Sequence, residues 1–140
     1  MDITNLVTKD NEEQGVWTQA VLYGDKQDFD ICILGSDSDA VKKFQRRQLK
    51  TLRNNKKGIE SFSDEALDAL LEGDIDNIVV RIAGLRSHNK HEEPLMLCGA
   101  ELKQDEASYR LLVEKIPAIK EFVLNFSNER ANFLSSKKKR

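Results

Sequence analysis

Two segments in the first quarter of the chain have the residue pattern of β-strands. Residues 16–23 and 29–34 are rich in β-branched and aromatic residues, which strands favour. Residues 24–28, between them, contain a glycine that tolerates positive φ and aspartates that can bond the backbone of a turn. We therefore predict a β-hairpin near the N-terminus.

Helical periodicity dominates the rest of the chain. Residues 38–54 predict a thinly apolar helix, and from Leu67 to Leu85 apolar side chains recur every three or four positions. Two more helices are expected at about 105–115 and from Pro117, a favoured first-turn residue, to about Leu134. The fold class expected is α+β, with an N-terminal β-hairpin followed by a mostly helical remainder of three to five helices.

The sequence gives further expectations for one polar stretch and for several individual residues. Gly73 and Asp74 can divide the middle helical pattern into two shorter helices. The polar stretch 87–103 is expected to be irregular. Trp17 and the six phenylalanines are expected in the core.

A chain of 140 residues is long enough to build one core without disulfides or metals. We expect a loose N-terminal arm over 1–14, a single α+β domain over 15–134 and a disordered basic tail over 135–140. No uninterrupted apolar run exceeds four residues, so no transmembrane helix or membrane partner is expected. The polar N-terminus and the two widely separated cysteines are typical of a protein of the cytoplasm.

Catalytic and metal-binding patterns are weak. His88, His91 and Cys98 are three potential zinc ligands in a polar loop, fewer than a structural zinc site needs, and Lys90 between the histidines would repel the metal. The chain contains no Gly-x-Ser-x-Gly stretch, phosphate-binding loop or dinucleotide fingerprint. We therefore expect no cofactor, no metal and no enzymatic activity.

A short polar segment lies between the second predicted strand and the first long helix. Gly35, Asp37, Ser38 and Asp39 are the residues singled out there. Ser and Asp side chains accept hydrogen bonds from the unpaired amides of a helix's first turn, so we interpret the segment as a helix cap. The alternative is a pair of carboxylates, Asp37 and Asp39, that binds a hard cation such as Mg²⁺.

Charge is segregated, although the 22 basic and 24 acidic residues nearly cancel to a net charge of −2. Residues 41–57 contain eight basic residues and no acidic one, and residues 58–80 contain seven acidic residues and no basic one. The blocks can pair within one fold or between copies. We expect weak homo-oligomerisation between two sets of residues, Lys42, Lys43, Arg46, Arg47 and Lys50 against Asp64, Glu65, Asp68 and Glu72. Nucleic-acid binding is disfavoured, because the acidic block would repel phosphates and only Phe44 could stack on a base.

Two stretches carry a family resemblance. The segment from Phe29 to Ala40, a strand ending in Leu-Gly-Ser-Asp-Ser-Asp before a helix, resembles the N-terminal signature of the tail assembly chaperones of long-tailed bacteriophages and prophages. The segment from Ala107 to Leu134, with its Ile-Pro turn, resembles the end of the same family. In the centre the chain reads Arg81-Ile82-Ala83-Gly84-Leu85, where the family pattern has a tryptophan.

The resemblance implies a non-enzymatic assembly factor of the bacterial host cytoplasm. Such chaperones coat the tape measure protein before the tail tube polymerises, and they are absent from the finished particle. The tape measure protein is therefore the partner that the resemblance implies. A structural or connector protein of the phage virion is the main alternative, and a small nucleic-acid-binding regulator is a further one.

Overall fold

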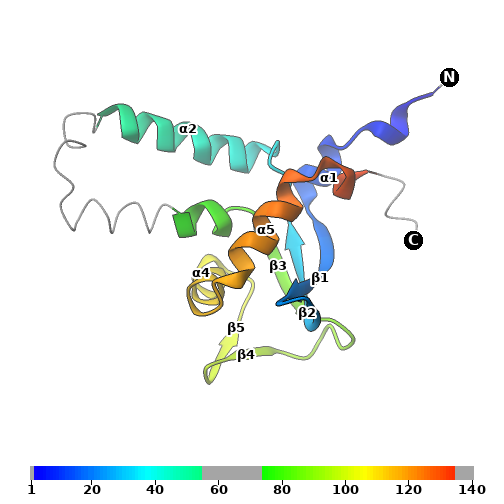
Figure 1. The fold of residues 1–140 in the computed structure, drawn as a ribbon, viewed down its shortest axis with the longest axis vertical. Coiled ribbons are helices and arrows are strands. Elements are labelled where there is room, and N and C mark those ends of the chain that lie inside the picture. Colours follow the sequence, from blue (N-terminus) through cyan, green and yellow to red (C-terminus); the bar gives the residue numbers. More distant parts are fainter. Residues whose placement is uncertain (1, 55–73, 135–140) are drawn as a thin grey trace.

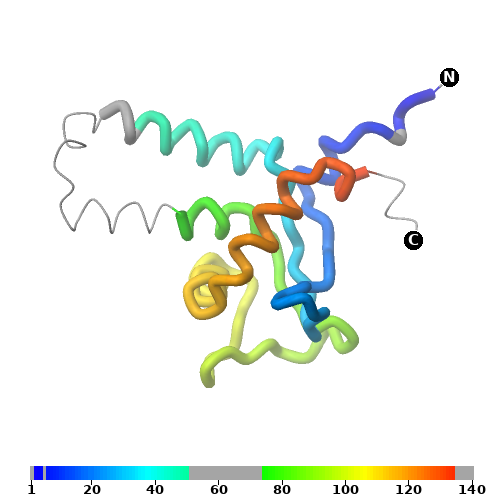
Figure 2. The backbone as a smooth tube through the Cα atoms, viewed as in Figure 1, coloured from blue at the N-terminus to red at the C-terminus, as the bar shows by residue number. Residues whose placement is uncertain are grey.

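The computed structural model describes residues 2–54 and 74–134, which form a small antiparallel sheet with helices packed on it (Figures 1 and 2). The predicted hairpin is confirmed: β1 (Val16–Leu22) pairs with β2 (Asp25–Ile33). The loop between them is tight, with Tyr23 at φ 57° and Gly24 at φ 81°. Positive φ at both positions is the geometry of the two-residue turns whose twist matches that of the strands.

A third strand, β3 (Ile82–Ser87), completes the sheet in the order β1-β2-β3. Its register places Leu85 opposite Ile31 and Gly84 opposite Cys32. The prediction that the helical pattern continues to Leu85 is therefore wrong. Within the described residues the helical segment ends at residue 79, and Ile82 and Leu85 are buried strand residues. Pairing with the open edge of β2 satisfies their backbone groups and buries the same apolar side chains.

A second, separate hairpin lies in the stretch that was expected to be irregular. Strand β4 (Leu95–Leu97) pairs with β5 (Ala100–Leu102) around a turn in which Cys98 and Gly99 have φ values of 51° and 83°. The fold class α+β with an N-terminal hairpin holds. A mostly helical remainder does not, because β3, β4 and β5 all lie there.

The helices after the two hairpins begin close to their predicted positions, but the last one ends at Asn128 rather than near Leu134. A 16-residue helix, α2 (Asp39–Asn54), follows the first hairpin, and α4 (Glu106–Lys115) and α5 (Ala118–Asn128) follow the second. Asp105 caps α4, since its Oδ1 accepts a hydrogen bond from the Ser108 amide at 2.8 Å, and this bond lowers the pKa of Asp105. None of the described helices has both the length and the apolar composition needed to span a bilayer.

Three short helices lie near the two ends of the described chain. The first two, η1 (Thr4–Leu6) and α1 (Lys9–Gln14), belong to the segment predicted as a loose arm. Asn11 and Glu12 of α1 are buried, so only residues 2–8 extend from the domain. The third, η2 (Arg130–Phe133), continues from α5, and Asn11 Nδ2 donates a hydrogen bond to the Phe133 carbonyl at 2.8 Å. Residues 135–140 lie outside the described part.

The core lies between one face of the sheet and helices α4 and α5. Ile31 and Ile33 of β2 pack in one cluster with Val113 of α4 and with Ile119 and Val123 of α5. Strand residues alternate between faces, so Asp30 and Cys32 point to the opposite side.

Trp17 lies on that opposite side too and is 40% exposed, so its expected place in the core is wrong. Its ring lies 4.1 Å from the guanidinium carbon of Arg86. It also packs on Gly84, where a Cβ would come within 2.7 Å of the indole. The sheet is therefore apolar on one face and mixed aromatic and polar on the other.

Candidate functional site

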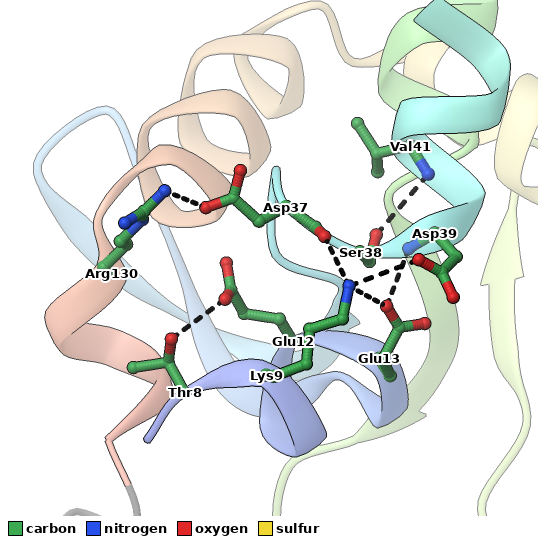
Figure 3. Close-up of polar contacts among 9 residues, drawn as sticks. All are labelled: Thr8, Lys9, Glu12, Glu13, Asp37, Ser38, Asp39, Val41 and Arg130. Carbon is green, nitrogen blue, oxygen red and sulfur yellow. Dashed lines mark hydrogen bonds and ion pairs between the residues drawn. The ribbon is translucent and has the colours of Figure 1, made fainter. Parts of the chain in front are cut away.

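The polar segment after β2 is the start of α2, as the sequence indicated, but one serine makes the cap bond. Ser38 is fully buried, and its Oγ accepts a hydrogen bond from the Val41 amide at 3.5 Å (Figure 3). Its carbonyl accepts from the Lys42 amide at 3.0 Å, the first bond of the helix. Ser38 therefore occupies the N-cap position.

The two aspartates bond to other parts of the chain instead. The Lys9 ammonium of α1 lies 2.9 Å from Glu13 Oε1 and 3.2 Å from Asp39 Oδ1, and it donates to the Asp37 carbonyl at 3.0 Å (Figure 3). The hydrogen bonds to Glu13 and Asp39 raise the pKa of Lys9. The carboxylate of Asp37 pairs with Arg130 of η2. The expectation that these two aspartates accept hydrogen bonds from the first-turn amides is wrong. Their carboxylates pair with Lys9 and Arg130 instead, because these cations from other parts of the chain lie within reach.

Gly35 allows the two chain segments to approach closely. Its amide donates to the Glu12 carbonyl at 3.0 Å, and a Cβ at this position would lie 2.2 Å from Glu12 Cγ. Glu12 is 3% exposed; one carboxylate oxygen accepts from Thr8 Oγ1 at 3.0 Å, and the other has no hydrogen-bond partner. Only glycine fits this contact, so close packing against Glu12 explains the glycine at position 35.

The contacts made by Lys9, Asp37 and Asp39 hold α1, α2 and η2 together. The Lys9 ammonium lies between the carboxylates of Glu13 and Asp39, and Arg130 pairs with Asp37, so both candidate Mg²⁺ ligands already contact a basic side chain. In the described ranges no three His, Cys, Asp or Glu side chains are grouped as metal ligands would be. The geometry therefore favours a structural role for the motif over a Mg²⁺ site.

A buried serine of α5 connects this group of helices to the sheet. Ser127 is 1% exposed and donates to the Leu34 carbonyl at 2.7 Å, while it accepts from Arg81 Nε at 3.1 Å. The Ser127 carbonyl accepts from the Ser36 amide at 3.1 Å. The end of β2, the residue before β3 and the end of α5 therefore share one polar network.

An open concavity lies between β1 and α5 and has several apolar side chains in its lining; we call it the β1–α5 groove. Its volume is about 570 Å³, and its lining comprises Val21, Leu22, Tyr23, Ala118, Glu121, Phe122, Asn125, Phe126 and Asn132. Tyr23 is 80% exposed and Val21 is 41% exposed, although both are large and apolar. Phe126 packs between Phe122 and Phe133, with ring centroids 6.3 Å and 5.8 Å away. The groove therefore has an apolar floor and an amide and carboxylate rim.

Sequence reasoning missed this groove, although one signal for it was present. Residues 20–23 are four apolar residues in succession at the end of a strand. A strand with one face in water alternates polar and apolar residues, so an unbroken run puts apolar side chains on both faces. The contribution of α5 could not be seen, because its residues lie about a hundred positions later.

The five basic residues of α2 that were expected to take part in self-association are exposed. Lys42, Lys43, Arg46, Arg47 and Lys50 lie on a helix that extends away from the sheet in Figure 1 and has Val41 as its buried apolar anchor. A shallow hollow of about 630 Å³ is lined by Lys43, Arg46 and Arg47 together with Asp39, Ala40 and Val80.

The acidic residues expected to meet this basic face, Asp64, Glu65, Asp68 and Glu72, lie outside the described residues. Two later members of the acidic block are described, and they pair elsewhere. Asp76 contacts Arg110 of α4, and Asp74 lies 3.6 Å from Lys120 of α5. The pairing of the two charge blocks stays a prediction.

His88 belongs to a polar cluster rather than to a group with His91 and Cys98. Its Nδ1 lies 2.6 Å from Oδ1 of the buried Asp30, whose other oxygen lies 3.1 Å from Arg86 Nε. Sequence reasoning did not find this cluster, because Asp30 and His88 are 58 positions apart. With Trp17 stacked on Arg86, the cluster fills the outer face of the sheet.

Comparison with known proteins adds no relative to these observations. The chain matches no protein-family model, no curated protein and no solved structure.

Proposed function

We propose that this protein is a non-enzymatic tail assembly chaperone of a long-tailed bacteriophage or prophage, which binds the tape measure protein during tail morphogenesis in the host cytoplasm. The β1–α5 groove is the observation that carries the proposal. The resemblance of the segments 29–40 and 107–134 to this family supports it, and the second of these segments supplies α5, one wall of the groove.

The groove has the chemistry that an amphipathic helix requires. Such a helix places its apolar face in a hydrophobic groove and keeps its polar face in water. Val21, Tyr23 and Phe122 supply apolar contacts, while Asn125 and Asn132 can bond polar groups at the edge of the bound helix. An open groove of this length suits the binding of about two turns of a helical client, so several copies of a chaperone could bind along one long helix.

The polar clusters of the described chain support a role without catalysis. Lys9, Asp37 and Asp39 are engaged with one another and with Arg130 in holding helices together. His88 Nδ1 contacts the buried Asp30, whose other oxygen pairs with Arg86, so this histidine belongs to the polar cluster on the outer face of the sheet.

A binding experiment with two groove variants tests the proposal. Tyr23→Asp and Val21→Asp each place a charge on an exposed groove residue, and aspartate tolerates the positive φ of Tyr23. Met96→Asp is the matched control, because Met96 is 61% exposed and lies on β4 outside the groove. Calorimetric titration with a helical segment of the tape measure protein encoded beside this gene should show binding that both groove variants weaken at least about tenfold. Absence of binding, or equal binding by all three variants, would overturn the proposal.

The two alternatives predict different results. A virion connector would be found by mass spectrometry in purified particles, where an assembly chaperone should be missing. A nucleic-acid-binding regulator is suggested by the exposed basic side chains of α2, yet Phe44, its aromatic residue, is partly buried. DNA binding through α2 would weaken steeply with salt, and Lys43→Glu would reduce it. DNA binding through α2, without binding of the tape measure segment to the groove, would favour the regulator.

A further inference from the structure

Exposed apolar side chains gather in two places on the described surface. The first is the N-terminal arm, residues 2–8, where Ile3, Leu6 and Val7 are 62%, 60% and 51% exposed. The second is the β1–α5 groove with Val21 and Tyr23. Grouped apolar side chains on a protein surface indicate contact with another molecule.

We propose that the N-terminal arm of one copy docks in the β1–α5 groove of a second copy. The chemistry of the two surfaces is complementary. The arm carries three large apolar side chains within five positions and a single charged residue, Asp2. The groove offers an apolar floor bordered by amide groups that can bond the polar backbone of a docked segment.

The lengths of the two surfaces also match. The groove follows α5 from Ala118 to Phe126, about 12 Å at the rise of an α-helix. Residues 3–7 span roughly 8 Å in the 3₁₀ conformation that η1 partly has, and about 14 Å when extended. The extended arm therefore spans the length of the groove.

The placement of the arm favours the groove of a second copy over its own. Backbone bonds hold the arm in turns, from the Leu6 amide to the Ile3 carbonyl at 2.9 Å and from the Val7 amide to the Thr4 carbonyl at 3.0 Å. In Figures 1 and 2 it runs outward from α1, away from the hairpin turn at the other end of the sheet. Tyr23 of the groove lies in that turn.

A contact between an arm and a groove joins two different surfaces. Each copy then uses its arm on one neighbour and its groove on the other, so the assembly grows head to tail into a ring or a filament. The seven residues of the arm bury far less area than a standard protein interface, so the association is weak and depends on concentration. Where the groove also holds the tape measure protein, which rests on the proposed function, client and arm compete for it.

Sedimentation equilibrium tests the association. The weight-average mass of the wild-type protein should rise between about 10 µM and about 1 mM. Leu6→Asp combined with Val7→Asp should weaken association at least about tenfold, Tyr23→Asp should do the same, and Met96→Asp should not. The effect should persist at about 1 M salt, where charge-mediated contacts are screened. A wild-type protein that stays monomeric, or arm variants that associate like the wild type, would overturn the proposal.

Disulfide trapping identifies which copy supplies the arm. In a Cys98→Ser background, protein with Leu6→Cys is mixed with protein carrying Asn125→Cys, and the thiols are oxidised with diamide. A disulfide-linked dimer should form about tenfold faster than when Met96→Cys replaces Asn125→Cys. Equal rates would overturn the proposal. The proposal would also be overturned if a double variant, Leu6→Cys with Asn125→Cys, formed its disulfide within single chains at high protein concentration. Neither result depends on a client, so a failure of the proposed function would leave them unchanged.

Discussion

Ser127→Ala is expected to destabilise the protein far more than the loss of one oxygen atom suggests. Ser127 is 1% exposed and lies where the end of α5 meets the end of β2. Its hydroxyl donates to the Leu34 carbonyl at 2.7 Å and accepts from Arg81 Nε at 3.1 Å. Alanine fills nearly the same space but leaves both partners without this bond.

The expected cost follows from the burial of those partners. A buried polar group left unpaired costs about 1–3 kcal/mol, and more when it is charged. Arg81 is 2% exposed, and burial lowers its pKa because the charged guanidinium is removed from water, so the hydrogen bonds to this group offset the cost of its burial. Two bonds to Asn77 stay, at 2.6 Å and 2.7 Å. We therefore expect a loss of about 2–3 kcal/mol in the free energy of unfolding. This corresponds to a fall of roughly 6–12 °C in Tm for a domain of this size.

Urea and thermal unfolding followed by circular dichroism at 222 nm measure this loss. Ser36→Ala is the matched control, because Ser36 also contacts Ser127, with 3.1 Å between the two hydroxyl oxygens, but is only half-buried. Water can replace its hydroxyl, so the control should lose less than about 1 kcal/mol. If Ser127→Ala costs no more than Ser36→Ala, the network does not hold α5 to the sheet and the reasoning is refuted.

Three further changes test other parts of the structure. Gly35→Ala should destabilise by more than about 2 kcal/mol or prevent folding, because its Cβ would lie 2.2 Å from Glu12 Cγ; a Tm close to that of the wild type would contradict this contact. Asp105→Asn should make the free energy of unfolding fall less steeply as the pH is lowered in the acid range. The folded-state pKa of Asp105 is depressed, so its contribution is complete above the unfolded value of 3.8 and is lost as the pH falls through the folded pKa. Equal acid-unfolding profiles for variant and wild type would contradict it. Arg46→Glu with Arg47→Glu should abolish any association that disappears at about 1 M salt, as light scattering at low salt can show; an unchanged mass would leave the charge blocks without a role between copies.

Local signals were sufficient for several elements of the fold. The first hairpin follows from two β-rich segments around Gly24, and α4 follows from its capping Asp105. The start of α2 was predicted from the polar segment after β2, although the cap bond is made by Ser38. Each of these signals lies within a few residues of the structure it specifies, so the sequence alone determines them.

Tertiary contacts decided the remaining strands and both candidate surfaces. The spacing of Ile82 and Leu85 suits a helix, but the free edge of β2, some 50 residues earlier, selects a strand, and an irregularity in the pairing between Ile82 and Gly84 allows both side chains to be buried. The carboxylate of Asp37 bonds Arg130, 93 positions away, instead of nearby amides. The β1–α5 groove joins side chains about a hundred residues apart, and Trp17 is on the surface because α4 and α5 cover the opposite face. The local pattern shows which residues prefer burial or a polar partner. The choice among distant partners is made by the packing that buries apolar surface while it leaves few buried polar groups without a hydrogen bond.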